Sequence, residues 1–117
     1  MLAFVLLRLA RIWGDAELER RAVGVLRLVR DVIPRAPSAF GWALCALDLY
    51  LSPPRELAII GAPDDAVARR ALADYDPNAV VAFGPDDEIP LLAGKGFVGG
   101  KPAVYACERF ACQAPFT

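Results

Sequence analysis

Residues 56–83 have the sequence ELAIIGAPDDAVARRALADYDPNAVVAF, in which two short apolar runs flank a helical segment. The first run ends at Gly61, which is typical of a buried strand. Pro63 and the two acidic residues after it favour the start of a helix, because carboxylates stabilise the positive end of a helix dipole. The second run, Ala79–Phe83, suits another buried strand. The segment therefore predicts a βαβ unit with parallel strands and a right-handed crossover.

The chain after this unit is expected to add one more strand. A loop rich in proline, aspartate and glycine covers residues 84–100, and Ala103–Phe110 forms a further apolar segment. The predicted second part of the protein, over residues 55–117, is thus a small βαβ-plus-strand unit.

The chain before it is expected to be helical over residues 1–54. Apolar residues recur at three- and four-residue spacing in three segments, which end at Trp13, Ile33 and Leu51. Gly14 ends the first segment and Asp15 is placed to cap the second. The predicted fold class is therefore α+β, with an N-terminal helical part followed by the βαβ-plus-strand unit.

The third predicted helix, Ala39–Leu51, is unusual because Asp48 is its one charged residue. Ser38 is placed to cap it. A helix that is apolar nearly all round must be covered on all sides. Two neighbouring helices and a small α/β unit are too little for that, so we expect this helix to need a partner outside the chain.

Composition excludes several classes of function. The 117 residues suffice for one domain, and 56% of them are hydrophobic. The formal net charge of -1 leaves no basic excess to attract nucleic acid or an anionic membrane, so neither partner is expected. Histidine is absent, which excludes an imidazole base, a Ser-His-Asp triad and a histidine-ligated metal.

The compartment is inferred from the apolar runs and the cysteines. The longest apolar runs fall far short of the ~20 residues of a membrane span, and the N-terminus lacks the pattern of a signal peptide. Three cysteines are too few for a secreted disulfide scaffold. We therefore expect a cytoplasmic protein whose thiols are mostly reduced.

Cys107 and Cys112 are the most suggestive pair of side chains. Their spacing places them on opposite faces of a regular strand, so a direct disulfide needs a bend between them, at Glu108–Arg109. Three cysteines without histidine are too few for zinc, and the turn after Gly61 lacks the glycines of a phosphate-binding loop. No metal or cofactor is expected. Packed, inert thiols are the preferred interpretation, with a disulfide or redox pair as the alternative.

Asp48 is the other candidate for a functional residue, because it interrupts an apolar helix. A buried carboxylate needs a partner, and such a residue sometimes lines an active cavity. A structural pairing with an arginine such as Arg8 or Arg55 is the preferred interpretation. The acidic cluster Asp86–Glu88 is interpreted as solvated loop charge.

Residues 100–117, GKPAVYACERFACQAPFT, resemble the terminal segment of the thioredoxin-domain-containing family named after spermatogenesis-associated protein 20. That segment contains glycine-lysine-proline, then Tyr-x-Cys-x-x-x-x-Cys and a proline near its end. Tyr105, Cys107, Cys112 and Pro115 match this pattern. The resemblance covers essentially the whole chain, because further family features follow in the same order at residues 37–41, 55–61, 63–64, 77–78, 90–92 and 94.

The resemblance implies an architecture and a role. Members of this family look like an N-terminal thioredoxin-like domain followed by an (α/α)6 toroid akin to six-hairpin glycosidases and sugar epimerases. The present chain matches the last toroid helices, over residues 1–54, and the terminal α/β appendage, over residues 55–117. The implied role is structural, completing and sealing the toroid without a complete active site of its own.

Other roles remain open within this resemblance. One is a thiol-redox accessory segment that uses Cys107 and Cys112, and another is a part of a carbohydrate-processing toroid. The expected partner is the remainder of the toroid, or a second copy bound through exposed apolar helices. The resemblance also implies that the helix of the βαβ unit ends early.

Overall fold

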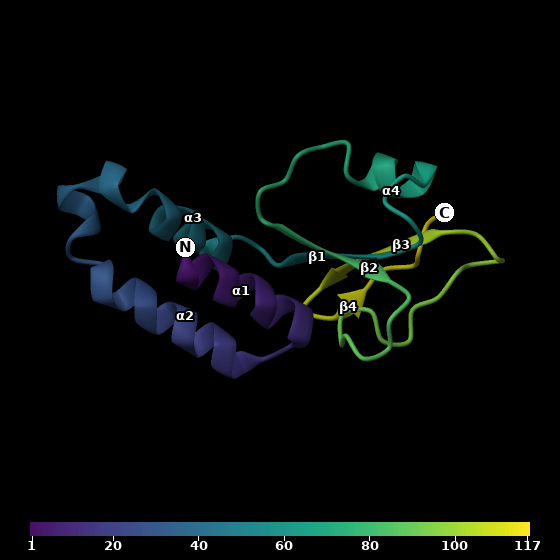
Figure 1. Cartoon of the computed structure of the whole chain (residues 1–117), viewed down its shortest axis with the longest axis horizontal. Helices are drawn as coiled ribbons and strands as arrows, with labels where there is room; N and C mark the ends of the chain where they lie inside the picture. The colour runs from purple at the N-terminus through teal and green to yellow at the C-terminus, as the bar shows by residue number, and fades with distance from the viewer.

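Three α-helices form one end of the molecule and a four-stranded sheet forms the other (Figure 1). The computed structural model describes residues 1–117 and has an elongated shape, with extents of 54 × 28 × 19 Å. The predicted α+β class is confirmed. The helices are α1 (Leu2–Trp13), α2 (Ala16–Val29), α3 (Gly41–Leu51) and α4 (Ala66–Ala71), and the strands are β1 (Arg55–Ile60), β2 (Ala79–Gly84), β3 (Ala103–Glu108) and β4 (Ala111–Cys112).

The predicted turn between the first two helices is confirmed. Gly14 ends α1 in a left-handed conformation, with φ of 64°. The Asp15 side chain then caps α2 by accepting hydrogen bonds from the backbone N–H groups of Glu17 at 2.8 Å and Leu18 at 3.3 Å. This cap fixes the direction in which α2 leaves the turn.

The second and third helices are shorter than predicted. Short 3-10 helices occupy Ile33–Arg35 and Pro37–Phe40, because their prolines cannot continue an α-helix. The predicted cap at Ser38 is wrong, since this residue lies within the second 3-10 helix and makes no capping hydrogen bond. The helical part has a small core in which several alanines let the helices approach closely: Ala3, Leu7, Ala22, Leu26, Ala46 and Leu49.

The sheet has the strand order β2-β1-β3-β4. β1 and β2 are parallel, as the βαβ prediction requires, and β3 is antiparallel to β1. The third strand ends at Glu108, before the predicted Phe110, because the chain turns back to form β4, which was not predicted. α4 ends early, at Ala71, as the resemblance implied, and Tyr75 beyond its end is 89% exposed.

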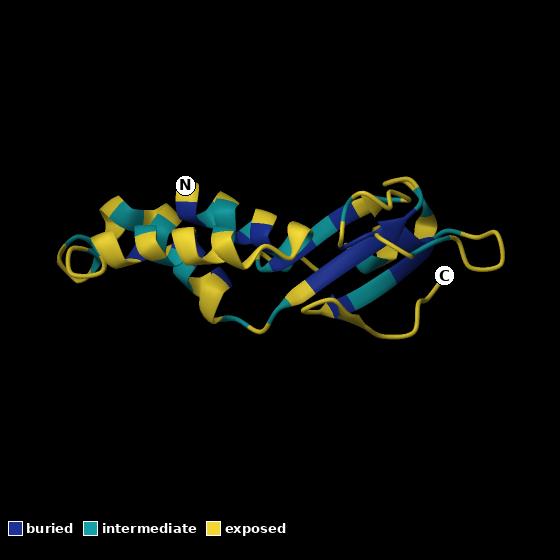
Figure 2. Ribbon diagram, turned by 90° about the horizontal axis from the view of Figure 1, so that it is seen from below, coloured by how far each residue is buried: buried dark blue, intermediate teal, exposed yellow.

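The two faces of β1 are covered by different parts of the chain. Leu57 and Ile59 contact Val67 and Ala68 of α4 on one face. The other face is covered by the loop residues Leu91 and Leu92 and by Ile12 of α1, which pack against Ala58 and Ile60. Figure 2 shows buried residues concentrated in the central strands, whereas the helices are exposed over much of their surface.

Two arginines of α1 join the helical end to the sheet end. Arg8 donates hydrogen bonds to the backbone carbonyls of Pro77 at 2.7 Å and Ala79 at 3.2 Å, and it lies over the Phe4 ring. Arg11, one turn later, donates to the carbonyl of Asn78 at 3.3 Å. The start of β2 is therefore held against α1 by charge-assisted hydrogen bonds.

Candidate functional site

Asp48 lies on an exposed part of α3 and not in a buried site. Its Oδ2 accepts a hydrogen bond from Nδ2 of Asn78 at 2.7 Å. The predicted pairing with Arg8 or Arg55 is wrong, because Arg8 donates to backbone carbonyls and Arg55 forms an ion pair with Asp76 at 3.0 Å. Asp48 therefore joins the third helix to the turn before β2, which is a structural role.

Cys107 and Cys112 are joined by a disulfide. They lie directly opposite each other on β3 and β4. Cys107 is 2% exposed and Cys112 is on the surface. The preferred interpretation of this pair as packed, inert thiols is therefore wrong, and the alternative, a disulfide, is found. Cys45, on α3, is the free cysteine and is exposed.

The bend that the disulfide needs is a two-residue turn at Arg109–Phe110, one residue later than predicted. Both residues have left-handed backbone conformations, with φ of 47° and 67°. This combination is that of a tight hairpin turn, which here lacks the glycine that such turns favour. The Phe110 ring lies against Gly14, the turn between α1 and α2. The hairpin is therefore fixed at its tip by Phe110 and across its strands by the disulfide.

The buried carboxylate of the protein is Glu56, at the start of β1, which is 1% exposed. Its Oε2 has no hydrogen-bond partner. Burial raises the pKa of Glu56 above its ordinary value of 4.5, and this effect is opposed by the backbone amides of Phe110 and Arg109 and by the positive charge of Arg11. A carboxyl group in this environment is suited to holding a proton.

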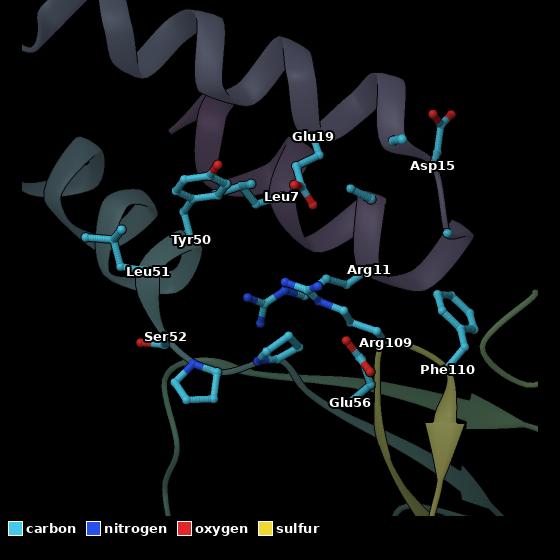
Figure 3. A pocket seen from close by; sticks show the side chains of 15 residues that line it. Leu7, Arg11, Asp15, Glu19, Tyr50, Leu51, Ser52, Glu56, Arg109 and Phe110 are labelled. Atoms are coloured by element: carbon cyan, nitrogen blue, oxygen red, sulfur yellow. The ribbon is translucent and has the colours of Figure 1, made fainter.

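A cavity of about 690 Å³ opens beside Glu56, between the helices and the β3–β4 hairpin. Figure 3 shows Glu56 and Arg11 pointing toward the same space, with Arg109 and Phe110 entering it from the hairpin. The other lining residues come from α1, the turn after it, the start of α2, and the segment from the end of α3 to β1, and include Leu7, Asp15, Glu19, Tyr50 and Leu51.

Arg11 lines this cavity from α1. It donates a hydrogen bond to the carbonyl of Leu49 at 2.7 Å, in addition to its bond with Asn78. Burial lowers the pKa of Arg11, and the charges of Glu56 and Glu19 raise it again. Arg11 therefore supplies a positive charge that opposes the raised pKa of Glu56, and it joins α1, the end of α3 and the turn before β2.

Glu56 is the site residue that the sequence analysis missed. It was included in the apolar run of the first strand and was not weighed as a functional group. The sequence does hold a signal, because a strand buried on both faces forces a glutamate within it to be buried. The chain contains no group of three or more His, Cys, Asp or Glu side chains placed to hold a metal ion, and no helix is both long and apolar enough for a membrane crossing.

Comparison with protein-family models, with curated proteins and with solved structures found no match for this chain. The assignment of function therefore depends on the geometry of the chain and on the sequence resemblance.

Proposed function

We propose that the chain is a structural unit that completes and seals a larger helical toroid, as the C-terminal portion of a protein of the family that it resembles. One observation carries this proposal: α1 is apolar on two faces. Its inner face, with Ala3, Leu7 and Ala10, is buried inside the chain. A second stripe on the same helix is exposed, and consists of Leu2, Val5, Leu9 and Trp13.

The exposed stripe follows the helix from end to end. Its members are three or four residues apart, so they project on one side of α1. Single exposed apolar residues are normal on protein surfaces, but an ordered stripe of large ones is typical of an interaction surface. This stripe is therefore the first surface on which we expect a partner helix to pack.

The third helix supports the same proposal. Ala46 and Leu49 are its fully buried residues. Leu44, Cys45 and Leu51 are exposed on its outer side. The chain itself thus covers only part of the apolar surface of α3. An additional helix layer would bury this surface, whereas the charged outer face of α2 suits contact with water.

The partner that fits these surfaces is an apolar helical face, as the remaining helices of a toroid would provide. The same proposal places the chain in the cytoplasm, although a disulfide such as that between Cys107 and Cys112 is uncommon there. Neither nucleic acid nor membrane binding is part of the proposal.

The test is to combine the chain with the remaining toroid helices of a full-length family member and to measure the mass of the product by light scattering. We expect a one-to-one complex. Leu9→Glu and Leu44→Glu, on the two exposed apolar surfaces, should abolish it. Leu28→Glu is the matched control, because Leu28 is 82% exposed on α2, outside both surfaces.

Two outcomes would contradict the proposal. One is a chain that remains a monomer in the mixture while its fold is intact by circular dichroism. The other is a complex that all three variants weaken equally. A dimer of the chain alone, abolished by the same two substitutions, would replace the toroid by a second copy as the partner.

A further inference from the structure

Three functional side chains lie in one row across the sheet. Glu56 on β1 is directly opposite Cys107 on β3, and Cys107 is directly opposite Cys112 on β4. Residues opposite each other on antiparallel strands project on the same face, with Cβ atoms ~4.5–5.5 Å apart. The buried carboxyl group and the disulfide are therefore immediate neighbours on the face of the sheet beside the cavity.

We propose that Cys107, Cys112 and Glu56 form a thiol–disulfide exchange site for dithiols, in which Glu56 donates a proton to the sulfur of Cys107. This inference goes beyond the structural role proposed above and does not depend on it. The row of side chains, the unequal exposure of its two cysteine residues and the unpartnered oxygen of Glu56 support it.

The exposure of the two cysteines determines where a dithiol reacts. Cys112 lies on the surface, in a two-residue edge strand whose residues are both exposed. Cys107 is 2% exposed and is covered from the side of β1. An incoming thiolate therefore reaches the sulfur of Cys112, and the sulfur of Cys107 is the leaving group.

The reaction proceeds in two exchanges. In the first, a thiolate of the dithiol forms a bond to Sγ of Cys112, and the bond between Cys107 and Cys112 breaks. The electron pair goes to Sγ of Cys107, which takes the proton of Glu56 and leaves a carboxylate. In the second, the other thiolate of the dithiol attacks the dithiol sulfur that is bonded to Cys112. A disulfide forms within the dithiol, the bond to Cys112 breaks, and the released Cys112 thiolate is protonated by water. The dithiol is oxidised to a disulfide, the protein disulfide is reduced, and Glu56 regains a proton from solvent.

Glu56 has the environment that this step needs. A thiolate at the buried Cys107 is poorly solvated, so its neutralisation by a nearby acid lowers the barrier. The burial of Glu56 favours its protonated form. The charges that act on it are those of Arg11 on α1 and Glu108 of the hairpin, and the side chains of Glu19 and Arg109 line the same cavity.

The experiment measures the rate of disulfide reduction by dithiothreitol. The variant Cys45→Ser serves as the background, so that the pair alone reacts, and alkylation followed by mass spectrometry counts the thiols formed. Glu56→Gln removes the donated proton and keeps the size of the side chain. Glu88→Gln is the matched control, since Glu88 is an exposed glutamate in the loop after β2 and is not among the groups that shift the pKa of Glu56.

We expect reduction of Glu56→Gln to be at least about tenfold slower than that of the control, within the range usual for loss of an acid catalyst. The rate per dithiothreitol thiolate should fall with rising pH in the background protein, as Glu56 ionises, and should not do so in Glu56→Gln. Repeating the assay with a reduced Cys-x-x-Cys protein shows whether a protein dithiol reacts faster than a small one.

Equal rates for the two variants at every pH would overturn the proposal, as would two free thiols after air oxidation of the background protein. If Glu56→Gln does not fold, the pH profile of the background protein decides alone. A rate per thiolate that does not change between about pH 5 and pH 9, a range that spans the pKa values of buried glutamates, would then overturn it.

Discussion

The ring of Phe110 packs against Gly14 on the side where any other residue would carry its Cβ. A Cβ added at Gly14 would lie 3.2 Å from Cζ of this ring. The contact joins the tip of the β3–β4 hairpin to the turn between α1 and α2, which are about a hundred residues apart in sequence. The disulfide hairpin is thereby held against the helical part, above the buried Glu56.

This contact makes Gly14 sensitive to substitution. Gly14→Ala should lower the free energy of unfolding by about 1–3 kcal/mol, because the new Cβ meets the Phe110 ring and the left-handed backbone disfavours alanine. Urea unfolding followed by circular dichroism measures the change. Gly24→Ala is the matched control on α2, where a Cβ has no neighbour within 4 Å. It should be stabilising by about 0.5–1 kcal/mol. Similar losses in both variants would contradict a specific contact between Gly14 and Phe110.

The burial of Glu56 predicts a dependence of stability on pH. Its pKa is raised in the folded chain, so the folded state holds this proton to higher pH than the unfolded state. The contribution of this proton to the free energy of unfolding is full at pH values below 4.5, the ordinary pKa of glutamate. It is lost as the pH rises through the higher pKa that Glu56 has in the folded chain. Each unit by which the pKa of Glu56 in the folded state exceeds that in the unfolded state corresponds to about 1.4 kcal/mol of unfolding free energy.

Glu56→Gln tests this dependence. The variant should match the natural chain at acidic pH and should be the more stable of the two at alkaline pH, because glutamine has no charge to desolvate. Urea unfolding at a series of pH values gives the difference. A difference that does not change with pH would show that Glu56 titrates as an exposed glutamate does.

The sequence predicted the parts of the fold that depend on local patterns. The apolar runs ending at Gly61 and starting at Ala79, with a helix between them, predicted the parallel pair of strands, and Gly14 and Asp15 predicted the first interhelical turn. The helix start expected at Pro63 is three residues early, because α4 begins at Ala66. These signals act over a few residues, so they do not depend on the rest of the chain. The short β4 strand was missed, because the Arg109–Phe110 turn lacks the usual glycine or asparagine.

The candidate site was predicted less well, because it depends on contacts between distant segments. Asp48 was singled out as the charge in an apolar helix, but its side of that helix is exposed. Glu56 was overlooked within a strand that is buried on both faces. Cys107 and Cys112 were identified as a pair, and their pairing depends on a turn whose geometry periodicity does not reveal.

Arg11 is predicted to contribute to stability as a bridge between the helices and the sheet. Arg11→Met should lower the free energy of unfolding by about 1.5–3 kcal/mol, because the carbonyls of Leu49 and Asn78 each lose a charged donor. Arg27→Met, on the exposed face of α2, is the control and should change stability by less than about 0.5 kcal/mol. Thermal and urea unfolding compare the two, and equal effects would show that Arg11 contributes no more than an ordinary surface arginine.

Reduction of the disulfide should destabilise the hairpin more than the rest of the fold. The bond between Cys107 and Cys112 closes a short loop, and the loss of such a cross-link corresponds to about 2 kcal/mol in the chain-entropy account. Without it, the left-handed turn at Arg109–Phe110 is held by the contact with Gly14 and by the short backbone pairing of β3 with β4. Amide hydrogen exchange with and without a phosphine reductant should therefore show faster exchange in β4 and the turn, with α1 and β1 unchanged. Faster exchange across the whole chain would mean that the hairpin and the helices unfold as one unit. Unchanged exchange in the turn would mean that the contacts remaining after reduction suffice to hold the turn in place.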